Sequence, residues 1–152
     1  MLRPATSADF AFIRGLASQP DNAPFITDEE EAALGVYLAE PSVRLLIWEV
    51  AGAPAGFALF CQIGEPSGAV ELRRLALAAT GGGQGQAFLR ALVDYGFGTL
   101  SAARVWLDAS GENPRAMKTY ERAGFALEGR LRQHWYRPAL GRVVDLILYG
   151  ML

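Results

Sequence analysis

The stretch that decides the fold reads Gly81-Gly82-Gly83-Gln84-Gly85, and it separates a run of alternating apolar residues from a helical pattern that begins at Gln86 or Ala87. Nearly bare backbone therefore lies at the N-terminus of a helix. The amide N–H groups there have no intrahelical acceptor, and the positive end of the helix dipole attracts anions. The stretch predicts a site for a phosphate or pyrophosphate group. The alternative interpretation is a flexible glycine turn without a ligand.

Two well-known phosphate-binding loops do not match this stretch. A P-loop requires a lysine directly after its last glycine, whereas the one lysine of the chain is Lys118. The dinucleotide-binding sequence Gly-x-Gly-x-x-Gly/Ala fails from Gly81 and from Gly83, because Gln86 or Phe88 then occupies its last position. The sequence excludes both of these loop types.

Composition limits the classes of protein to which the chain can belong. With 152 residues, 51% of them hydrophobic and 20% charged, the sequence suits one domain with its own buried core. A net charge of −2 argues against a nucleic-acid partner. No apolar run approaches the roughly 20 residues that span a bilayer, and no signal-peptide pattern follows Met1, so we expect no membrane partner and a cytoplasmic location. With one histidine and one cysteine, we expect neither a metal site nor an internal disulfide.

Hydrophobic alternation predicts the strands of a mixed α/β chain. Three of the runs follow one another with short Gly- and Pro-containing turns between them, which is typical of an antiparallel meander. The last two runs are joined by residues 138–141, Pro-Ala-Leu-Gly, and indicate a hairpin. The expected strands cover residues 1–3, 43–50, 55–63, 69–77, 104–109, 125–136 and 142–149.

Helical periodicity and capping residues predict helices between these strands. Thr27 followed by Glu30 has the pattern of a capping box for the second helix. Asn113 caps the fourth helix, and Pro114 takes its first position. The start and stop signals, in chain order, are Thr6 and Pro20, Thr27 and Pro41, Gln86 and Gly96 with Gly98, and Asn113 and Gly124.

A second motif lies downstream, where residues 113–125 read Asn-Pro-Arg-Ala-Met-Lys-Thr-Tyr-Glu-Arg-Ala-Gly-Phe. It resembles the Asn-x-x-Ala-x-x-x-Tyr-x-x-x-Gly-Phe segment of the GNAT superfamily of N-acetyltransferases. The family's acetyl-CoA loop, Gln/Arg-x-x-Gly-x-Gly/Ala, resembles residues 80–85, with Thr80 in place of the usual Gln or Arg. Within the family, residues 128–132 and 145–150 look most similar to the ribosomal-protein N-terminal acetyltransferases.

The resemblance implies a fold and a function. The fold is α/β (α+β), a central mixed, mostly antiparallel sheet of about seven strands with about four helices on both faces. Residues 1–152 would form a single N-acetyltransferase domain. Such an enzyme moves an acetyl group from acetyl-CoA, without a metal, to a primary amine by direct attack in a ternary complex. The acceptor would be a protein or peptide N-terminus or a small amine, and a homodimer is one assembly that the resemblance allows.

The resemblance also assigns cofactor-binding residues. The backbone of residues 75–77 would pair with the pantetheine arm like an added strand, and the loop would hold the pyrophosphate. Tyr120 would contact the cofactor as well, and Asn113 is a further candidate, although helix capping explains it equally well. The assigned positions are Leu75, Ala76, Leu77, Gly81, Gly82, Gly83, Gln84, Gly85, Gln86, Asn113 and Tyr120.

Tyr120 and Glu71 are the catalytic residues that the resemblance implies. Tyr120 would be the general acid that protonates the departing sulfur, and its alternative is an aromatic packed beside Ala116 and Met117. Glu71 would deprotonate the incoming ammonium, often through water, and its alternative is an ion pair with Arg73 on the same strand face.

The acceptor side is less specific in the sequence. His134, the one histidine, is the alternative base. The candidates for acceptor contacts are Phe25, Arg73, His134 and Trp135. Two rival functions stay open, a catalytically inactive CoA-binding module and a nucleotide-binding regulatory module that uses the glycine loop.

Overall fold

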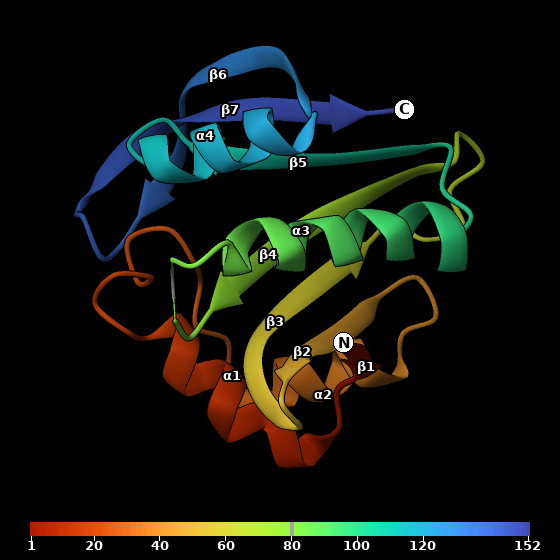
Figure 1. The fold of residues 1–152 in the computed structure, drawn as a ribbon. Coiled ribbons are helices and arrows are strands. Elements are labelled where there is room, and N and C mark those ends of the chain that lie inside the picture. Colours follow the sequence, from red (N-terminus) through yellow and green to blue (C-terminus); the bar gives the residue numbers. More distant parts are fainter. Residues whose placement is uncertain (80) are drawn as a thin grey trace.

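A mixed sheet forms the centre of the molecule (Figure 1). The computed structural model describes residues 1–79 and 81–152. Over these residues the sheet has seven strands in the order β1-β2-β3-β4-β5-β7-β6, with β4 and β5 parallel and the other neighbours antiparallel. This confirms the predicted mixed, mostly antiparallel sheet. The strands are β1 (Leu2–Pro4), β2 (Arg44–Val50), β3 (Ala53–Cys61), β4 (Ala69–Leu77), β5 (Arg104–Ser110), β6 (Ala126–Arg137) and β7 (Arg142–Met151).

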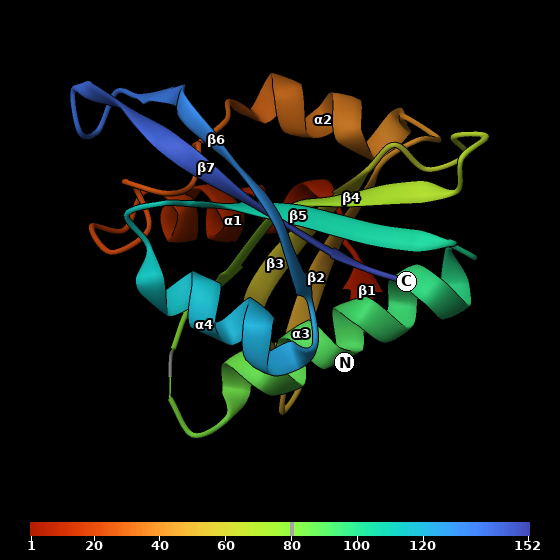
Figure 2. The same cartoon turned by 90° about the horizontal axis from the view of Figure 1, so that it is seen from above.

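Helices cover both faces of this sheet, as predicted (Figure 2). A 3₁₀ turn, η1 (Ser7–Asp9), leads into α1 (Phe10–Ala17), and a π-helical turn, η2 (Tyr95–Thr99), extends α3. The other helices are α2 (Glu31–Ala39), α3 (Gln84–Asp94) and α4 (Pro114–Ala123). The pair α1 and α2 lies on one face, and the pair α3 and α4 lies on the other. Among the described residues, no helix is long and apolar enough to cross a membrane.

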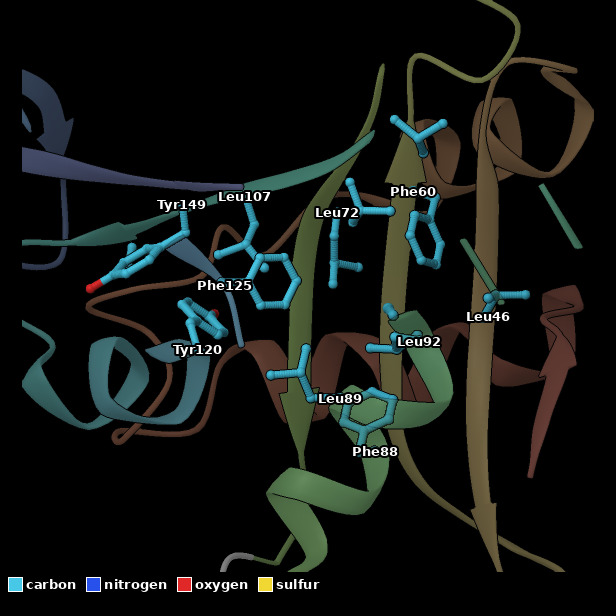
Figure 3. Packing of buried hydrophobic residues seen from close by; sticks show 14 of the residues in the cluster. Leu46, Phe60, Leu72, Phe88, Leu89, Leu92, Leu107, Tyr120, Phe125 and Tyr149 are labelled. Carbon is cyan, nitrogen blue, oxygen red and sulfur yellow. The ribbon is translucent and has the colours of Figure 1, made fainter. Parts of the chain in front are cut away.

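Alternation along the strands fills one hydrophobic cluster on each face. Figure 3 shows the cluster under α3, where Phe88, Leu89 and Leu92 pack on the strands. Each fully buried side chain of this size contributes about 1.5 to 3 kcal/mol relative to exposure. The strand residues of that cluster include Leu46, Phe60, Leu72, Leu107 and Tyr149, and the opposite cluster includes Ile13, Leu16, Leu34, Leu45, Ile47, Phe57 and Leu59.

The second helix begins later than its capping box predicts. Its first residue is Glu31, and Glu30 precedes it in extended backbone. The oxygen Oγ1 of Thr27 instead accepts a hydrogen bond from Nη1 of Arg137 at 3.2 Å. The capping box was therefore a wrong prediction, because a tertiary contact from β6 engages the hydroxyl that would have capped the helix.

The third helix ends close to the predicted stop at Gly96 and Gly98, because α3 ends at Asp94 and only one π-helical turn follows. The π-helical turn runs through Gly96 and Gly98 to Thr99. A Cβ placed on Gly96 would lie 3.0 Å from Cγ2 of Val105, so this glycine lets the helix approach β5 closely. Gly96 therefore lies at the end of the helix and also allows close packing on β5.

The strands β4 and β5 part near their middle. They pair through Ala69–Arg104, Val70–Val105 and Glu71–Trp106. Beyond these pairs, β4 stays with β3 as far as Leu77, whereas β5 stays with β7 as far as Ser110. Figure 1 shows the two strands diverging toward the glycine loop and α4.

A β-bulge marks the same region of β4. Leu59 pairs with Arg74 and Phe60 with Leu72, so Arg73 is an extra residue on β4. Such a bulge bends its strand and increases the local twist, and this turns β4 away from β5.

Candidate active site

A cleft of about 890 Å³ opens where β4 and β5 part. Its walls come from both strands, the glycine loop with the start of α3, the start of α4, and the segment after α1. The structure therefore brings most of the predicted site residues together around one opening. The predicted residues that line it are Phe25, Glu71, Arg73, Leu75, Ala76, Leu77, Gly81, Gly85, Gln86, Asn113, Tyr120 and Trp135.

Four of the predicted residues do not line the cleft. Gly82 and Gly83 are exposed on the loop that leads into α3, and Gln84 is exposed at the first position of that helix. His134 is exposed on β6. Thr80, the position that departs from the family's loop, lies outside the described residues.

The edge of β4 that faces the opening has backbone groups available for a ligand. The N–H of Ala78 donates to the carbonyl of Ala55 at 2.8 Å, which fixes the alternation of the β3–β4 ladder. Residues one step away point their N–H groups to the opposite side. The amides of Leu77 and Leu75 therefore point toward the opening, as an added strand requires.

Glycine is required in the loop by its backbone conformation. Gly81, Gly82 and Gly83 have φ values of 96°, 62° and 77°, a left-handed region that strains other residues. At the start of α3, in the described part of the chain, the amides of Gly85 and Gln86 have no backbone acceptor. These amides border the cleft at the positive end of the helix dipole, so the loop has the geometry of an anion site.

The cap of α4 agrees with the sequence prediction. Oδ1 of Asn113 accepts from the N–H of Ala116 at 3.2 Å, Pro114 takes the first helical position, and Gly124 ends the helix with a φ of 104°. Capping thus accounts for Asn113, which also lines the cleft. The helix fixed in this way carries Tyr120 on its inner face.

Tyr120 is buried between two aromatic rings (Figure 3). Its ring meets Tyr149 and Phe125 edge-on at centroid distances of 5.8 and 6.2 Å. Burial, and to a smaller extent the charge of Asp108, raises the pKa of the Tyr120 phenol well above its usual value. The phenol therefore stays protonated at neutral pH.

Glu71 is engaged by its neighbour on β4. Nε and Nη2 of Arg73 donate to the two carboxylate oxygens of Glu71 at 2.8 and 3.1 Å. The Glu71 side chain is 9% exposed, whereas that of Arg73 is 41% exposed. The ion pair that the sequence offered as the alternative for Glu71 is thus present, and it lies within the cleft.

The structure adds a carboxylate that sequence reasoning missed, Asp108 of β5. It lines the cleft, and burial together with the charge of Glu71 raises its pKa to about 6. One signal was available, because Asp108 interrupts the apolar run from Val105 to Ala109. Charged residues are seldom placed within a buried strand without a partner or a task.

Arg137, also missed, fixes the outer wall of the cleft. It is 4% exposed, and it donates from Nε to the carbonyl of Pro24 at 3.0 Å and from Nη2 to that of Ala23 at 2.9 Å. Its guanidinium carbon lies 4.0 Å from the centroid of the Trp135 ring. The same side chain therefore ties β6 to the segment that carries Phe25.

Arg74, the second arginine of β4 at the cleft, is also paired. Its Nη2 lies 2.8 Å from Oε1 of Glu29, which accepts a further hydrogen bond from the Tyr37 hydroxyl at 2.9 Å. Both cleft arginines of β4 are therefore held by carboxylates. Within the described ranges 1–79 and 81–152, no group of three or more His, Cys, Asp or Glu side chains is arranged to hold a metal ion.

Comparison with solved structures shows the fold. A spermidine N-acetyltransferase from Vibrio cholerae in complex with CoA and spermine matches with a TM-score of 0.88 and 22% identity, over 100% of this chain and 94% of that one. A dodecameric structure of spermidine N-acetyltransferase from Vibrio cholerae in an intermediate state matches with a TM-score of 0.81 and 25% identity, over 100% and 92%. These likenesses confirm the predicted GNAT fold.

Sequence comparison shows the family. The spermidine N(1)-acetyltransferase of Vibrio cholerae serotype O1 is 37% identical over 57 residues, which are 35% of this chain and 33% of that protein. The match thus spans about a third of the length of this curated relative. The model of the acetyltransferase (GNAT) family matches residues 10–125, which include the glycine loop and the segment around Tyr120. The chain therefore belongs to the acetyltransferase (GNAT) family, and this membership confirms the predicted enzyme class, N-acetyltransferase, and the predicted cosubstrate, acetyl-CoA.

Proposed function

We propose that this protein transfers the acetyl group of acetyl-CoA to a primary amine of a small polycation of the polyamine class. One observation carries the proposal: where β4 and β5 part, the carboxylates of Glu71 and Asp108 line the same cleft as Tyr120 and the glycine loop. The relatives described above act on spermidine, which is a cation of this class.

The backbone supplies the donor site in this proposal. The amides at the start of α3 bind the pyrophosphate, and the open edge of β4 pairs with the pantetheine arm. An N–H of that edge, from Leu75 or Leu77, polarises the acetyl carbonyl. Acetyl-CoA supplies the activated acyl group when it is bound, and Tyr120 protonates the departing sulfur.

The charges on the β4 and β5 walls of the cleft favour a cationic acceptor over an acidic one. Arg73 and Arg74 are neutralised by Glu71 and Glu29, so neither offers a free positive charge. Within the described residues, burial and distant charges act on the Asp108 carboxylate, and no hydrogen bond does. A unit charge pair at 4 Å is worth about 1 kcal/mol in water and about 4 kcal/mol near a protein surface. A polyamine carries further positive charges and therefore gains over a monoamine of the same length, which carries only one.

A thiol-release screen tests the proposal. Native protein and acetyl-CoA are mixed with spermidine, spermine, an alkyl monoamine of similar length, and peptides with free N-termini. We expect kcat/KM to be at least about tenfold higher for the polyamines than for the monoamine, from one favourable charge contact. Turnover confined to the peptides would instead support the ribosomal-protein N-terminal branch.

Thermal shift separates the remaining alternatives. Saturating acetyl-CoA should raise the melting temperature, because a tight ligand adds several kcal/mol to stability. A shift with acetyl-CoA and no thiol release with any amine would favour the inactive CoA-binding module. A shift with ATP and none with acetyl-CoA would favour the nucleotide-binding regulator. The homodimer stays a prediction, which sedimentation of the free protein checks.

A further inference from the structure

We propose that Asp108 takes the proton from the acceptor ammonium, a role that the family resemblance assigns to Glu71. The inference rests on the proposed function and names a catalytic residue within it. Asp108 lies on β5, two residues beyond Trp106, which forms the last pair with β4 at Glu71. Its position therefore places a carboxylate on the β5 wall at the point where the cleft opens.

The hydrogen bonds of the two carboxylates differ. Both oxygens of Glu71 accept from the guanidinium of Arg73, at 2.8 and 3.1 Å. Proton uptake by Glu71 would break a bidentate ion pair, which is a strong type of hydrogen bond. Asp108 accepts no hydrogen bond from the described part of the chain. It lines the cleft, so its lone pairs are available to an incoming ammonium.

The surroundings of Asp108 make it a stronger base than an ordinary aspartate. Burial first and the negative charge of Glu71 second raise its pKa to about 6, whereas the charges of Arg73 on β4 and His134 on β6 act in the opposite direction. On the side of α4, the phenol of Tyr120 is neutral in the pH range where Asp108 titrates, because burial raises its pKa. A rise of about two pKa units makes proton uptake about a hundredfold more favourable, and it brings the base closer to neutral pH.

The step balances as follows. One oxygen of Asp108 takes a proton from R–NH₃⁺, and the freed lone pair of nitrogen forms a bond to the acetyl carbonyl carbon. The carbon–sulfur bond breaks, and its electron pair leaves on sulfur, which receives the phenolic proton of Tyr120. The second nitrogen proton restores the phenol. The products are the acetamide, the coenzyme A thiol and one proton, which Asp108 returns to solvent.

The pH dependence of kcat/KM for spermidine, at saturating acetyl-CoA, tests the inference. We expect Asp108→Asn to lose about 10²- to 10⁴-fold at pH 7, the usual contribution of a general base, and to recover partly at high pH, where free amine is present. Asp108→Glu keeps a carboxylate and should retain an acid limb at intermediate rate. Glu71→Gln should lose less and should move that limb to lower pH, because the charge of Glu71 raises the pKa of Asp108.

Asp94→Asn is the matched control, since Asp94 is exposed at the end of α3. It should keep the native profile. Calorimetry with acetyl-CoA should give Asp108→Asn a native affinity, which shows that the variant is folded. An active native enzyme whose Asp108→Asn variant keeps both its rate and its acid limb would overturn the assignment of Asp108 alone. A native enzyme that binds acetyl-CoA but releases no thiol with any amine would overturn the proposed function, and the assignment with it.

Discussion

The side-chain amide of Gln86 donates a hydrogen bond to the backbone carbonyl of Thr119 at 3.1 Å. Gln86 belongs to the first turn of α3, directly after the glycine loop, and Thr119 immediately precedes Tyr120 on α4. The two sequence motifs are therefore joined by one contact. This contact fixes the position of Tyr120, the candidate general acid, relative to the glycine loop, the candidate phosphate site.

Replacement of Gln86 tests that coupling. We expect Gln86→Ala to lower the free energy of unfolding by about 1 kcal/mol and to raise the KM for acetyl-CoA, because α4 loses its tie to the loop. Chemical denaturation and steady-state kinetics measure both effects. Gln84→Ala removes an exposed side chain one half-turn away and should leave stability within about 0.5 kcal/mol. Equal losses in the two variants would contradict the prediction.

Tyr120 and Tyr149 form a matched pair of buried phenols. Tyr120→Phe should lower kcat about 10²-fold or more, since only the proton donor is removed, with little change in melting temperature. In Tyr149, the hydroxyl donates to Oε2 of Glu121 at 2.8 Å. Burial, together with this hydrogen bond, raises the pKa of the Tyr149 phenol to about 12. Tyr149→Phe should therefore cost stability, about 1 kcal/mol, and leave kcat nearly native. Undiminished turnover in Tyr120→Phe would refute the general-acid role.

Glycine at position 83 can be compared with a glycine in the same conformation elsewhere. Gly83 and Gly52 have φ values of 77° and 78°, and an added Cβ would contact nothing within 4 Å at either position. Alanine should strain both loops by about 1 to 2 kcal/mol. Calorimetry should show a loss of acetyl-CoA affinity for Gly83→Ala alone, because Gly52 lies in the β2–β3 turn. Equal acetyl-CoA affinity in the two variants would show that the glycine loop does not contribute to acetyl-CoA binding.

Arg137→Met should loosen the wall of the cleft. The variant leaves the carbonyls of Ala23 and Pro24 without their donor, which costs about 1 to 3 kcal/mol for a buried group. We expect a raised KM for the amine, an unchanged KM for acetyl-CoA, and faster proteolysis within residues 20–27. Arg132→Met, on the exposed face of the same strand, serves as the control. A selective rise in the KM for acetyl-CoA would contradict this role.

Stability should depend on pH through Asp108. Its folded-state pKa of about 6 lies above the ordinary value of 3.8, so the folded protein binds the proton more tightly than the unfolded chain does. The native protein therefore loses stability as pH rises from about 4 to about 6, and it stays less stable above that range. Asp108→Asn should be more stable than native by about 1 to 3 kcal/mol at pH 7 and equal to it below about pH 4. Melting curves of both proteins across this range measure the difference, and a constant difference at all pH values would contradict the prediction.

Local signals in the sequence predicted what local physics determines. The cap at Asn113, the stop at Gly124 and the glycine loop before α3 each depend on a few neighbouring residues, and the structure confirms them. The strands other than β6 follow their alternation because each has one face on a hydrophobic cluster. The order of the motifs along the chain then indicated the family, although the acceptor left no comparable pattern.

Tertiary contacts account for what the sequence could not show. Thr27 does not cap α2 because a guanidinium more than a hundred residues away engages its hydroxyl. Arg137 was missed because its partners are backbone carbonyls, which have no sequence pattern. Asp108 was missed because its importance comes from the end of a strand pairing, and strand alternation does not reveal where two strands part.

The parting of β4 and β5 also divides the sheet mechanically. The sheet has two parts, one formed by β1 to β4 and the other by β5, β7 and β6. Strand pairing joins these parts through the pairs from Ala69–Arg104 to Glu71–Trp106. Away from these strand pairs, packing between α3 and α4 connects the two parts. A donor arm aligned with the free edge of β4 would fill the place of an interior strand. The protein with bound acetyl-CoA would then unfold as one unit. Without acetyl-CoA, the two parts of the sheet would separate between β4 and β5 before the rest unfolds.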